Sequence, residues 1–188
     1  MLASQSPRRA EILRQAGIPF TVRFAAVDET PLAGEKPEDY VRRLAEWKAR
    51  AVEAAPGEIV LGADTTVVIE GRMLGKPAGQ ADARRMLELL SGRRHQVMTG
   101  ICLKRGSESV RDGEVTEVRF APMTAAEIDA YAASGEPMDK AGAYAIQGLA
   151  SKFIEGLNGC YFNVVGLPVT LVYKHLKAMS GQQFRAAL

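Results

Sequence analysis

The amino-acid sequence predicts a mixed α/β fold, and three observations support this prediction. Segments with strand-like alternation and segments with helical periodicity follow one another along the whole chain. Its 188 residues are enough for one well-packed domain. No repeat of fixed period, low-complexity linker or sharp change of composition divides the sequence. We therefore expect a single domain over residues 1–188, with a loose tail at about 179–188.

The first half of the chain is expected to open with a short strand at 1–3 and a capped helix. Ser6 is a favoured N-cap residue, Pro7 is tolerated in the first helical turn, and Gly17 is a natural helix end. The elements expected next are a strand at 20–27, a helix at 37–55 and, over 58–74, a strand followed by a hairpin that turns at Glu70-Gly71.

The second half is expected to alternate helices with one pair of long strands. A serine or threonine before a helical pattern is a start signal, and Thr124 supplies one. The expected elements are helices at 80–92, 124–135 and 167–178, paired strands at 94–104 and 109–120, and a glycine-dense stretch at 135–166.

Composition excludes several classes of function. The net charge is only +2 and the basic residues are spread along the chain, which argues against a nucleic-acid scaffold. Cys102 and Cys160 are far apart and form no CxxC pattern, so neither a zinc site nor a disulfide framework is expected. The sequence has no apolar run of signal-peptide or membrane-spanning length. We expect a soluble cytoplasmic protein without nucleic-acid or membrane partners.

Arg8 and Arg9 break a local rule, because they lie in the first turn of the expected helix. Each cation there opposes the helix macrodipole and costs roughly 0.3–1 kcal/mol. The two arginines favour an anionic ligand, since a helix N-terminus already offers unpaired N–H groups to a phosphate. The alternative is that both side chains bend outward into water, where the unfavourable interaction is screened.

Asp64 and Lys48 are charged residues at positions where the surrounding pattern is apolar. Asp64 follows "IVLGA", and an ionised carboxylate in a buried strand is costly unless it is paired or bound to a metal. It is either a turn residue or a carboxylate that faces a ligand cleft. Lys48 falls within the apolar stripe of the helix at 37–55. Its ammonium therefore either reaches out to solvent or points into a phosphate-binding cavity.

Two further segments, "GKP" at 75–77 and "SGRRHQVMTG" at 91–100, hold basic residues next to turns. Lys76 follows a glycine that lets the backbone approach a ligand, although such tripeptides are also common in turns. The arginines of the second segment are explained by capping of the preceding helix C-terminus. A neutral His95 in a structural hydrogen bond is the preferred interpretation there.

Gln147 lies in the glycine-dense stretch, where close backbone packing around a ligand is expected. Its amide presents a donor beside an acceptor, which matches the imide edge of uracil or thymine. The flipped amide also matches cytosine. A buried glutamine that bonds the backbone is an equally common alternative.

Six sequence elements are together similar, in their order and approximate spacing, to the Maf-like nucleoside triphosphate pyrophosphatase family. They are "SQSPRR", "GADTTV", "GKP", "SGRRHQVMTG", "AGAYAIQG" and "NVVGLP", and the resemblance extends from Leu2 to about His175. It implies a mixed, twisted sheet with flanking helices and two lobes around a central substrate cleft, as in Maf and ITPase proteins. The "AYAIQG" element resembles the branch that acts on dTTP and UTP, whereas the branch acting on 7-methylguanosine triphosphate carries a glutamate near that glutamine.

The resemblance also implies roles for particular residues. Family members cleave the α–β phosphoanhydride of a nucleoside triphosphate, which gives the monophosphate and pyrophosphate. The aspartate that matches Asp64 acts as proton acceptor, and the residues linked to substrate choice match Arg8, Thr65 and Gln147. The other residues expected to line the same cleft match Ser6, Arg9, Glu29, Lys48 and Lys76.

A divalent cation, Mg²⁺ or Mn²⁺, is the expected cofactor, with Glu29 and Asp64 as its protein ligands. The resemblance implies a homodimer that takes dTTP and UTP, with modified pyrimidine nucleotides as further candidates. Two alternatives stay open. One is hydrolysis of another nucleotide, such as a methylated purine nucleotide, and the other is a nucleotide-binding regulator of cell division and septum formation with little turnover.

Overall fold

A computed structural model of the protein describes residues 1–181, which form two compact units. The first unit contains Met1–Asp64, Thr99–Glu114 and the described residues from Gly166 onward. The second contains Thr65–Met98 and Val115–Val165. The expectation of a single domain over 1–188 stays a prediction. Most of the expected tail, residues 182–188, lies outside the described part of the chain.

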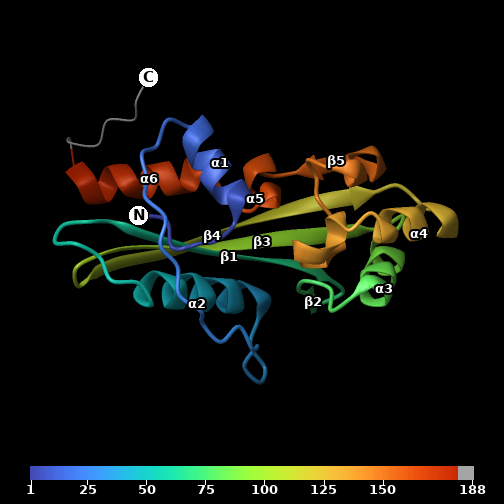
Figure 1. The fold of residues 1–188 in the computed structure, drawn as a ribbon, viewed down its shortest axis with the longest axis horizontal. Helices are drawn as coiled ribbons and strands as arrows, with labels where there is room; N and C mark the ends of the chain where they lie inside the picture. Colours follow the sequence, from blue (N-terminus) through green and yellow to red (C-terminus); the bar gives the residue numbers. More distant parts are fainter. Residues whose placement is uncertain (182–188) are drawn as a thin grey trace. The chain divides into compact units, whose positions relative to one another are not determined.

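A five-stranded sheet has the order β2-β1-β3-β4-β5, and its three central strands contain residues of both units (Figure 1). The strands are β1 (Val60–Ile69), β2 (Arg72–Leu74), β3 (Arg94–Arg105), β4 (Glu108–Phe120) and β5 (Ile154–Asn158). β1 pairs with β2, and β4 with β5, in antiparallel orientation. The β1–β2 hairpin turns at Glu70 and Gly71, both with positive φ, as the sequence predicts.

In the first unit, three helices flank the strands. They are α1 (Pro7–Gln15), α2 (Pro37–Arg50) and α6 (Val169–Ser180). Figure 1 shows α2 on one side of the strands and α1 and α6 on the other. Ser6 caps α1 through a 3.5 Å contact from the Arg9 backbone N–H to its hydroxyl, which confirms the predicted start of this helix.

Two glycines allow α2 to lie directly against the strands of the first unit. A Cβ built on Gly62 of β1 would meet the carbonyl oxygen of Ala45 at 2.0 Å. A Cβ on Gly100 of β3 would meet the backbone of Val41 at 2.4 Å. Any larger residue would therefore push the helix away, and the position of α2 depends on these two glycines.

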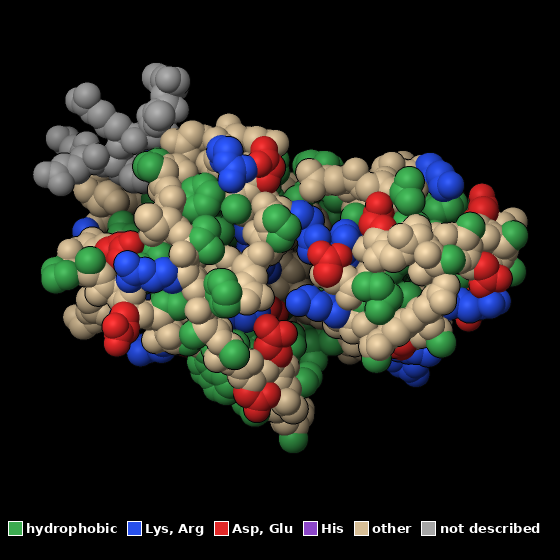
Figure 2. Space-filling model, in the orientation of Figure 1, with side chains coloured by type: hydrophobic (Ala, Val, Ile, Leu, Met, Phe, Trp, Pro, Cys, Tyr) green, Lys and Arg blue, Asp and Glu red, His purple; other side chains and the backbone are tan. Residues whose placement is uncertain are grey.

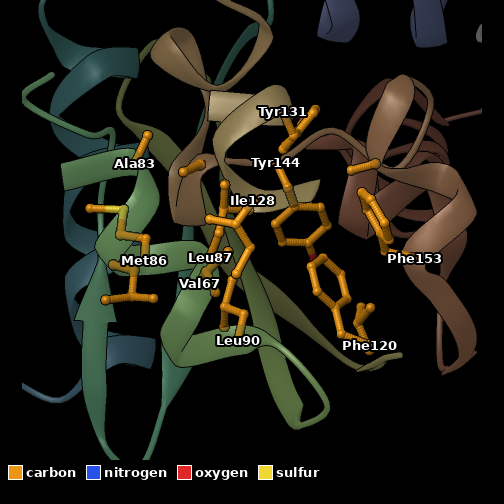
Figure 3. Packing of buried hydrophobic residues seen from close by; sticks show 14 of the residues in the cluster. Val67, Ala83, Met86, Leu87, Leu90, Phe120, Ile128, Tyr131, Tyr144 and Phe153 are labelled. Carbon is orange, nitrogen blue, oxygen red and sulfur yellow. The ribbon is translucent and has the colours of Figure 1, made fainter. Parts of the chain in front are cut away.

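The second unit contains α3 (Gln80–Leu90), α4 (Ala125–Ala133), the 3₁₀ helices η1 (Glu136–Asp139), η2 (Ala141–Ala143) and η3 (Leu149–Phe153), and α5 (Tyr161–Val165). α4 begins with a capping box in which Thr124 and Glu127 bind each other's backbone N–H. Buried side chains from α3, α4, the strands and the 3₁₀ segments form one hydrophobic cluster, shown in Figure 3. This cluster anchors the glycine-dense stretch that the sequence did not resolve into elements.

Three expected elements differ from the structure. The strands expected at 1–3 and 20–27 are reduced to isolated parallel bridges, in which Leu2 pairs with Val22 and with Leu61. The helix expected at 37–55 ends at Arg50. The residues beyond it are drawn into tertiary contacts instead, since Arg23 donates to the carbonyl oxygen of Glu53 at 2.9 Å.

The face of the molecule drawn in Figure 2 agrees with the even distribution of charge along the sequence. On the face drawn in Figure 2, Lys and Arg side chains are scattered among Asp and Glu side chains. None of the helices formed by residues 1–181 is long and apolar enough to cross a membrane.

Candidate active site

Three charged residues of the first unit, Lys48, Asp64 and Glu29, lie close together. The Lys48 ammonium donates to Asp64 Oδ1 at 2.5 Å and lies 2.6 Å from Glu29 Oε1. The side chains of Lys48 and Asp64 are only 16% and 11% exposed, whereas that of Glu29 is 50% exposed. One cation therefore bridges a buried and an exposed carboxylate. Asp64 is a paired residue inside a strand, and Lys48 does not reach out to solvent.

The packing of α2 on β1 creates the Lys48–Asp64 pair. Gly62 and Asp64 are two residues apart on β1, so they face the same side of the strand. That side is the one covered by α2, because Ala45 and Ala49 of the helix contact Gly62. Lys48 follows Ala45 by three residues and so lies on the same helical face. The close approach at Gly62 brings the ammonium to the carboxylate.

Glu29 is held over α2 by residues that the sequence analysis missed. The Tyr40 hydroxyl donates to the backbone oxygen of Glu29 at 2.9 Å, and Arg43 donates to that of Thr30 at 3.2 Å. Both side chains belong to α2, so the same helix presents Lys48 and fixes the loop that carries Glu29.

Arg43 is itself locked in place by neighbouring side chains. It donates to both oxygens of Glu35, at 2.6 and 2.7 Å, and its guanidinium lies 4.4 Å from the centre of the Trp47 ring. Bidentate pairing and an aromatic face together fix the orientation of an arginine. The signal in the sequence was the spacing of Tyr40, Arg43 and Trp47, which places all three on one helical face.

The surroundings of Asp64 act in opposite directions on its protonation. Burial is the largest influence and raises the pKa of Asp64 above its ordinary value, and the Glu29 charge adds to this. The cations of Lys48 and Arg9 oppose the rise. Burial also raises the pKa of Tyr40 to about 12, so its hydroxyl keeps the proton that it donates to Glu29.

Arg9 is buried, with 8% of its surface exposed, and it binds protein oxygens. Its guanidinium donates to the carbonyl oxygens of Ala63 and Gly166, both at 2.8 Å, and to the Ser4 hydroxyl at 3.1 Å. It therefore ties the chain before Asp64 to the start of the C-terminal segment. The sequence suggested that Arg9 either binds an anionic ligand or bends outward into water, and neither interpretation included this structural role. Its role in substrate binding stays a prediction.

Arg8 and Ser6 lie at the N-terminus of α1, and both are partly exposed. The first turn of α1 holds two arginines and no acidic residue. This geometry keeps the helix N-terminus suited to an anion. The substrate-binding roles expected of both residues stay predictions.

The remaining predicted site residues belong to the second unit. Thr65 follows Asp64 on β1 and is partly exposed. Lys76 is exposed in the turn after β2, where the carbonyl oxygen of Gly75 accepts a 3.0 Å hydrogen bond from Gly142 N–H. Gln147 is exposed between η2 and η3, so it is not a buried backbone-binding glutamine. The expectation that these residues bind substrate stays a prediction.

The segment at 91–100 has the structural roles that were preferred for it. Arg93 donates to the carbonyl oxygen of Leu89 at 3.3 Å, in the last turn of α3. His95 is buried, and its Nε2 lies 2.8 Å from the Tyr144 hydroxyl. Burial lowers the pKa of His95 to about 4, so the ring is neutral at physiological pH. These findings confirm helix capping by Arg93 and the structural histidine, whereas Arg94 pairs with Glu117 at 2.8 Å and does not cap the helix.

The first unit could hold a divalent cation through two carboxylates. Glu29 and Asp64 both contact the Lys48 nitrogen, so their oxygens converge within reach of a single positive charge. Mg²⁺ is commonly held by one or two carboxylates, with phosphate oxygens and waters completing its shell. No group of three or more His, Cys, Asp or Glu residues suited to a metal occurs within residues 1–181. The pair fits a cation shared with a phosphate ligand better than a permanent all-protein metal centre.

The fold places the protein in a known structural class. The Ham1 protein of Staphylococcus aureus has a similar fold, with a TM-score of 0.51 over 94% of this chain and 97% of that one, at 15% sequence identity. This similarity confirms the expected sheet with flanking helices. The sequence also matches the pattern of the Maf-like protein family over residues 1–179. The chain belongs to this family, as its six motifs predicted.

Relatives named dTTP/UTP pyrophosphatase are similar over most of the chain. The protein from Symbiobacterium thermophilum is 56% identical over 90% of this chain and 88% of its own length. That from Koribacter versatilis is 50% identical over 94% and 92%, respectively. The Bacillus cereus protein is 49% identical over 94% and 93%.

Proposed function

We propose that this protein is a nucleoside triphosphate pyrophosphatase that hydrolyses the α–β phosphoanhydride of dTTP and UTP, releasing the monophosphate and pyrophosphate. The observation that carries the proposal is the buried Asp64 carboxylate, 2.5 Å from the Lys48 ammonium, at the expected proton-acceptor position. The names of relatives that are 49% to 56% identical support the substrate assignment.

In the proposed reaction, Asp64 accepts a proton from the attacking water. A carboxylate whose pKa is raised by burial is a stronger base than one in water, and such perturbed groups are typical of catalytic positions. Lys48 keeps this carboxylate oriented through its direct contact. The water oxygen forms a bond to the α-phosphorus as the bond from that phosphorus to the α–β bridging oxygen breaks, and pyrophosphate leaves with the electron pair.

The substrate's negative charge calls for several positive groups. Arg8 at the start of α1 can bind phosphate oxygens together with the helix N–H groups that begin after Ser6. Lys48 and Lys76 are the lysines we assign to the same task. Interactions of this kind accelerate the reaction when they strengthen as charge develops on the departing pyrophosphate.

A divalent cation, Mg²⁺ or Mn²⁺, is the proposed cofactor, and Glu29 and Asp64 would hold it. When bound, it would neutralise phosphate charge and act as a Lewis acid. Glu29 suits this role because Tyr40 and Arg43 fix its loop while its carboxylate stays half exposed.

Gln147 is the proposed reader of the base. Its amide can accept from the imide N–H of uracil or thymine and donate to the neighbouring carbonyl oxygen. The side chain is exposed, so it is available to a ligand. We also propose that the protein acts as a cytoplasmic homodimer, which size-exclusion chromatography with light scattering would test.

The experiment that tests this function is a substrate panel. Purified protein is incubated with Mg²⁺ or Mn²⁺ and each common ribonucleoside and deoxyribonucleoside triphosphate, together with 7-methyl-GTP, and the products are separated by chromatography. We expect UMP and dTMP, each in equal amount with pyrophosphate, and loss of both products when EDTA is added. Release of inorganic phosphate as the first product would show cleavage of the β–γ bond and would contradict the proposal.

Two other outcomes would replace the proposal. Preferential cleavage of 7-methyl-GTP would make the protein a pyrophosphatase for methylated purine nucleotides. Tight binding of a triphosphate without turnover, measured by calorimetry, would favour the nucleotide-binding regulator instead.

A further inference from the structure

The segment that carries Gln147 is a short turn with buried ends. Tyr144 and Ala150, on either side of it, are both buried in the core of the second unit. Within the turn, the Gly148 N–H donates to the carbonyl oxygen of Ala145 at 3.1 Å. Gln147 lies between these two residues and is exposed. The turn therefore holds the backbone of Gln147 at a defined place while its amide stays accessible.

Tyr131 and Glu136 bind the backbone on both sides of Gln147. The Tyr131 hydroxyl accepts a hydrogen bond from the Ala145 N–H at 3.2 Å and donates to Glu136 Oε1 at 2.7 Å. Both oxygens of the Glu136 carboxylate lie 3.1 Å from the Leu149 N–H. One connected pair of side chains thus holds the residue two positions before Gln147 and the residue two positions after it.

Gly148 is required for this arrangement. A Cβ built on Gly148 would lie 2.3–2.4 Å from the carboxylate atoms of Glu136. Real Cβ atoms do not approach this closely, and the obstructing group is fixed by its own hydrogen bonds. The carboxylate can lie against the turn only because residue 148 has no side chain.

Both members of the pair are held firmly. Tyr131 belongs to the core cluster drawn in Figure 3, and burial raises the pKa of its hydroxyl, which therefore keeps the proton it donates. Glu136 is the first residue of η1. Its N–H donates to the Ser134 hydroxyl at 3.2 Å, and its carbonyl oxygen accepts from the Lys140 ammonium at 2.8 Å.

We propose that Tyr131 and Glu136 are positioning residues that fix Gln147 for recognition of the pyrimidine base. This inference rests on the proposed function, in which Gln147 reads uracil and thymine. An amide that recognises a base edge must be held within a few tenths of an ångström, and supporting hydrogen bonds to the backbone provide that precision. Neither residue touches the base; each acts through the 145–149 turn.

Five variants, one of them a control, and a double-mutant cycle test this proposal. Tyr131→Phe and Glu136→Ala remove one side of the arrangement, Glu136→Gln keeps an acceptor for the Leu149 N–H, and Gln147→Ala removes the reader. Ile128→Val is the matched control, because Ile128 is buried on the same helix and in the same cluster as Tyr131. For each variant, the melting temperature and the kcat and KM for UTP and CTP are measured.

We expect Tyr131→Phe and Glu136→Ala to raise the KM for UTP about tenfold and to lower the preference for UTP over CTP, with kcat little changed. Glu136→Gln should recover most of the loss. In the Gln147→Ala background, Tyr131→Phe should have no further effect on the KM for UTP, because its effect passes through Gln147. Ile128→Val should lower the melting temperature and leave the UTP preference unchanged.

The outcomes separate this inference from the function on which it rests. If the wild-type protein does not hydrolyse UTP or dTTP, both proposals are wrong. If it does, and Tyr131→Phe lowers only the melting temperature or acts additively with Gln147→Ala, the positioning role is wrong and the proposed function stands.

Discussion

The Lys48 ammonium nitrogen lies 2.5 Å from Asp64 Oδ1, although the two residues are 16 positions apart in the chain. Both side chains are mostly buried, so neither charge is screened by much water. Buried ion pairs of this kind contribute little net stability, because desolvation offsets the attraction between the charges. A role in the reaction therefore explains this pair better than a role in folding does.

Replacing Asp64 with asparagine should abolish most turnover and leave the fold intact. Asparagine has nearly the same shape, but it cannot accept the proton from the attacking water. We expect kcat for UTP to fall by about 10²–10⁴-fold, which is the usual contribution of a general base. Turnover and the melting temperature would be measured for Asp64→Asn and for Asp112→Asn, a control that alters a carboxylate paired with His175 in the same unit. Activity within a few-fold of wild type would contradict the proposed role.

Arg8 and Arg9 should respond differently to substitution, although they are neighbours. Arg9→Met removes the donor for two carbonyl oxygens and the Ser4 hydroxyl, all in a buried place. Leaving such acceptors unsatisfied should cost at least about 2 kcal/mol of unfolding free energy.

Arg8→Ala should instead leave the unfolding free energy nearly unchanged and raise the KM for UTP about tenfold, because a partly exposed guanidinium at a helix N-terminus is lost as a phosphate ligand. Urea unfolding and steady-state kinetics on both variants would check this division. Equal losses of stability would show that Arg8 is also structural.

Local signals in the sequence were sufficient for much of the fold. The Ser6 and Thr124 caps and the turn at Glu70-Gly71 depend on residues close together in the chain, and all three were predicted. The strand expected at 20–27 was mostly wrong because its apolar alternation is not matched by burial, since Val22 and Phe24 are exposed. The extended segment keeps only the bridge to Leu2.

The candidate site was predicted as a set of residues and not as a geometry. The apolar pattern around Asp64 and Lys48 singled out these two residues, and motif resemblance added Glu29. Their meeting depends on how closely α2 approaches Gly62. That distance is a property of tertiary packing, which no spacing in the sequence encodes. The same reason explains why the sequence did not reveal that Arg9 binds carbonyl groups 54 and 157 positions away.

Gln147→Glu should weaken binding of uracil and thymine nucleotides. The carboxylate can accept from the imide N–H but cannot donate to the neighbouring carbonyl oxygen, and it repels that oxygen. We expect kcat/KM for UTP and dTTP to fall about tenfold or more. Gln80→Glu is the control, since it makes the same change at an exposed position of the second unit. Unchanged kinetics for UTP in Gln147→Glu would end the proposed role in base recognition.

His95 should make the protein less stable as the pH falls from neutral to about 4. Burial lowers the pKa of His95 from 6.5 to about 4. Its Nδ1 has no hydrogen-bond partner among residues 1–181, so no neighbouring acceptor stabilises the ring when both of its nitrogens carry a proton. Between these two pH values the unfolded chain binds more protons than the folded one, so unfolding becomes more favourable as the pH falls. The stabilising contribution is complete above pH 6.5 and is lost progressively down to about pH 4.

The loss attributable to His95 should be about 3 kcal/mol over that range. Urea unfolding at several pH values would measure it in the wild type and in His95→Gln, which does not titrate. Tyr144→Phe is the control, because it removes the hydrogen-bond partner of His95 and keeps the titrating ring. The carboxylates that also titrate near pH 4 are common to all three proteins, so they cancel in the comparison. We expect a flatter profile for His95→Gln alone. Parallel profiles for His95→Gln and wild type would show that His95 takes up its proton over the same pH range in the folded and the unfolded chain, which would contradict the prediction.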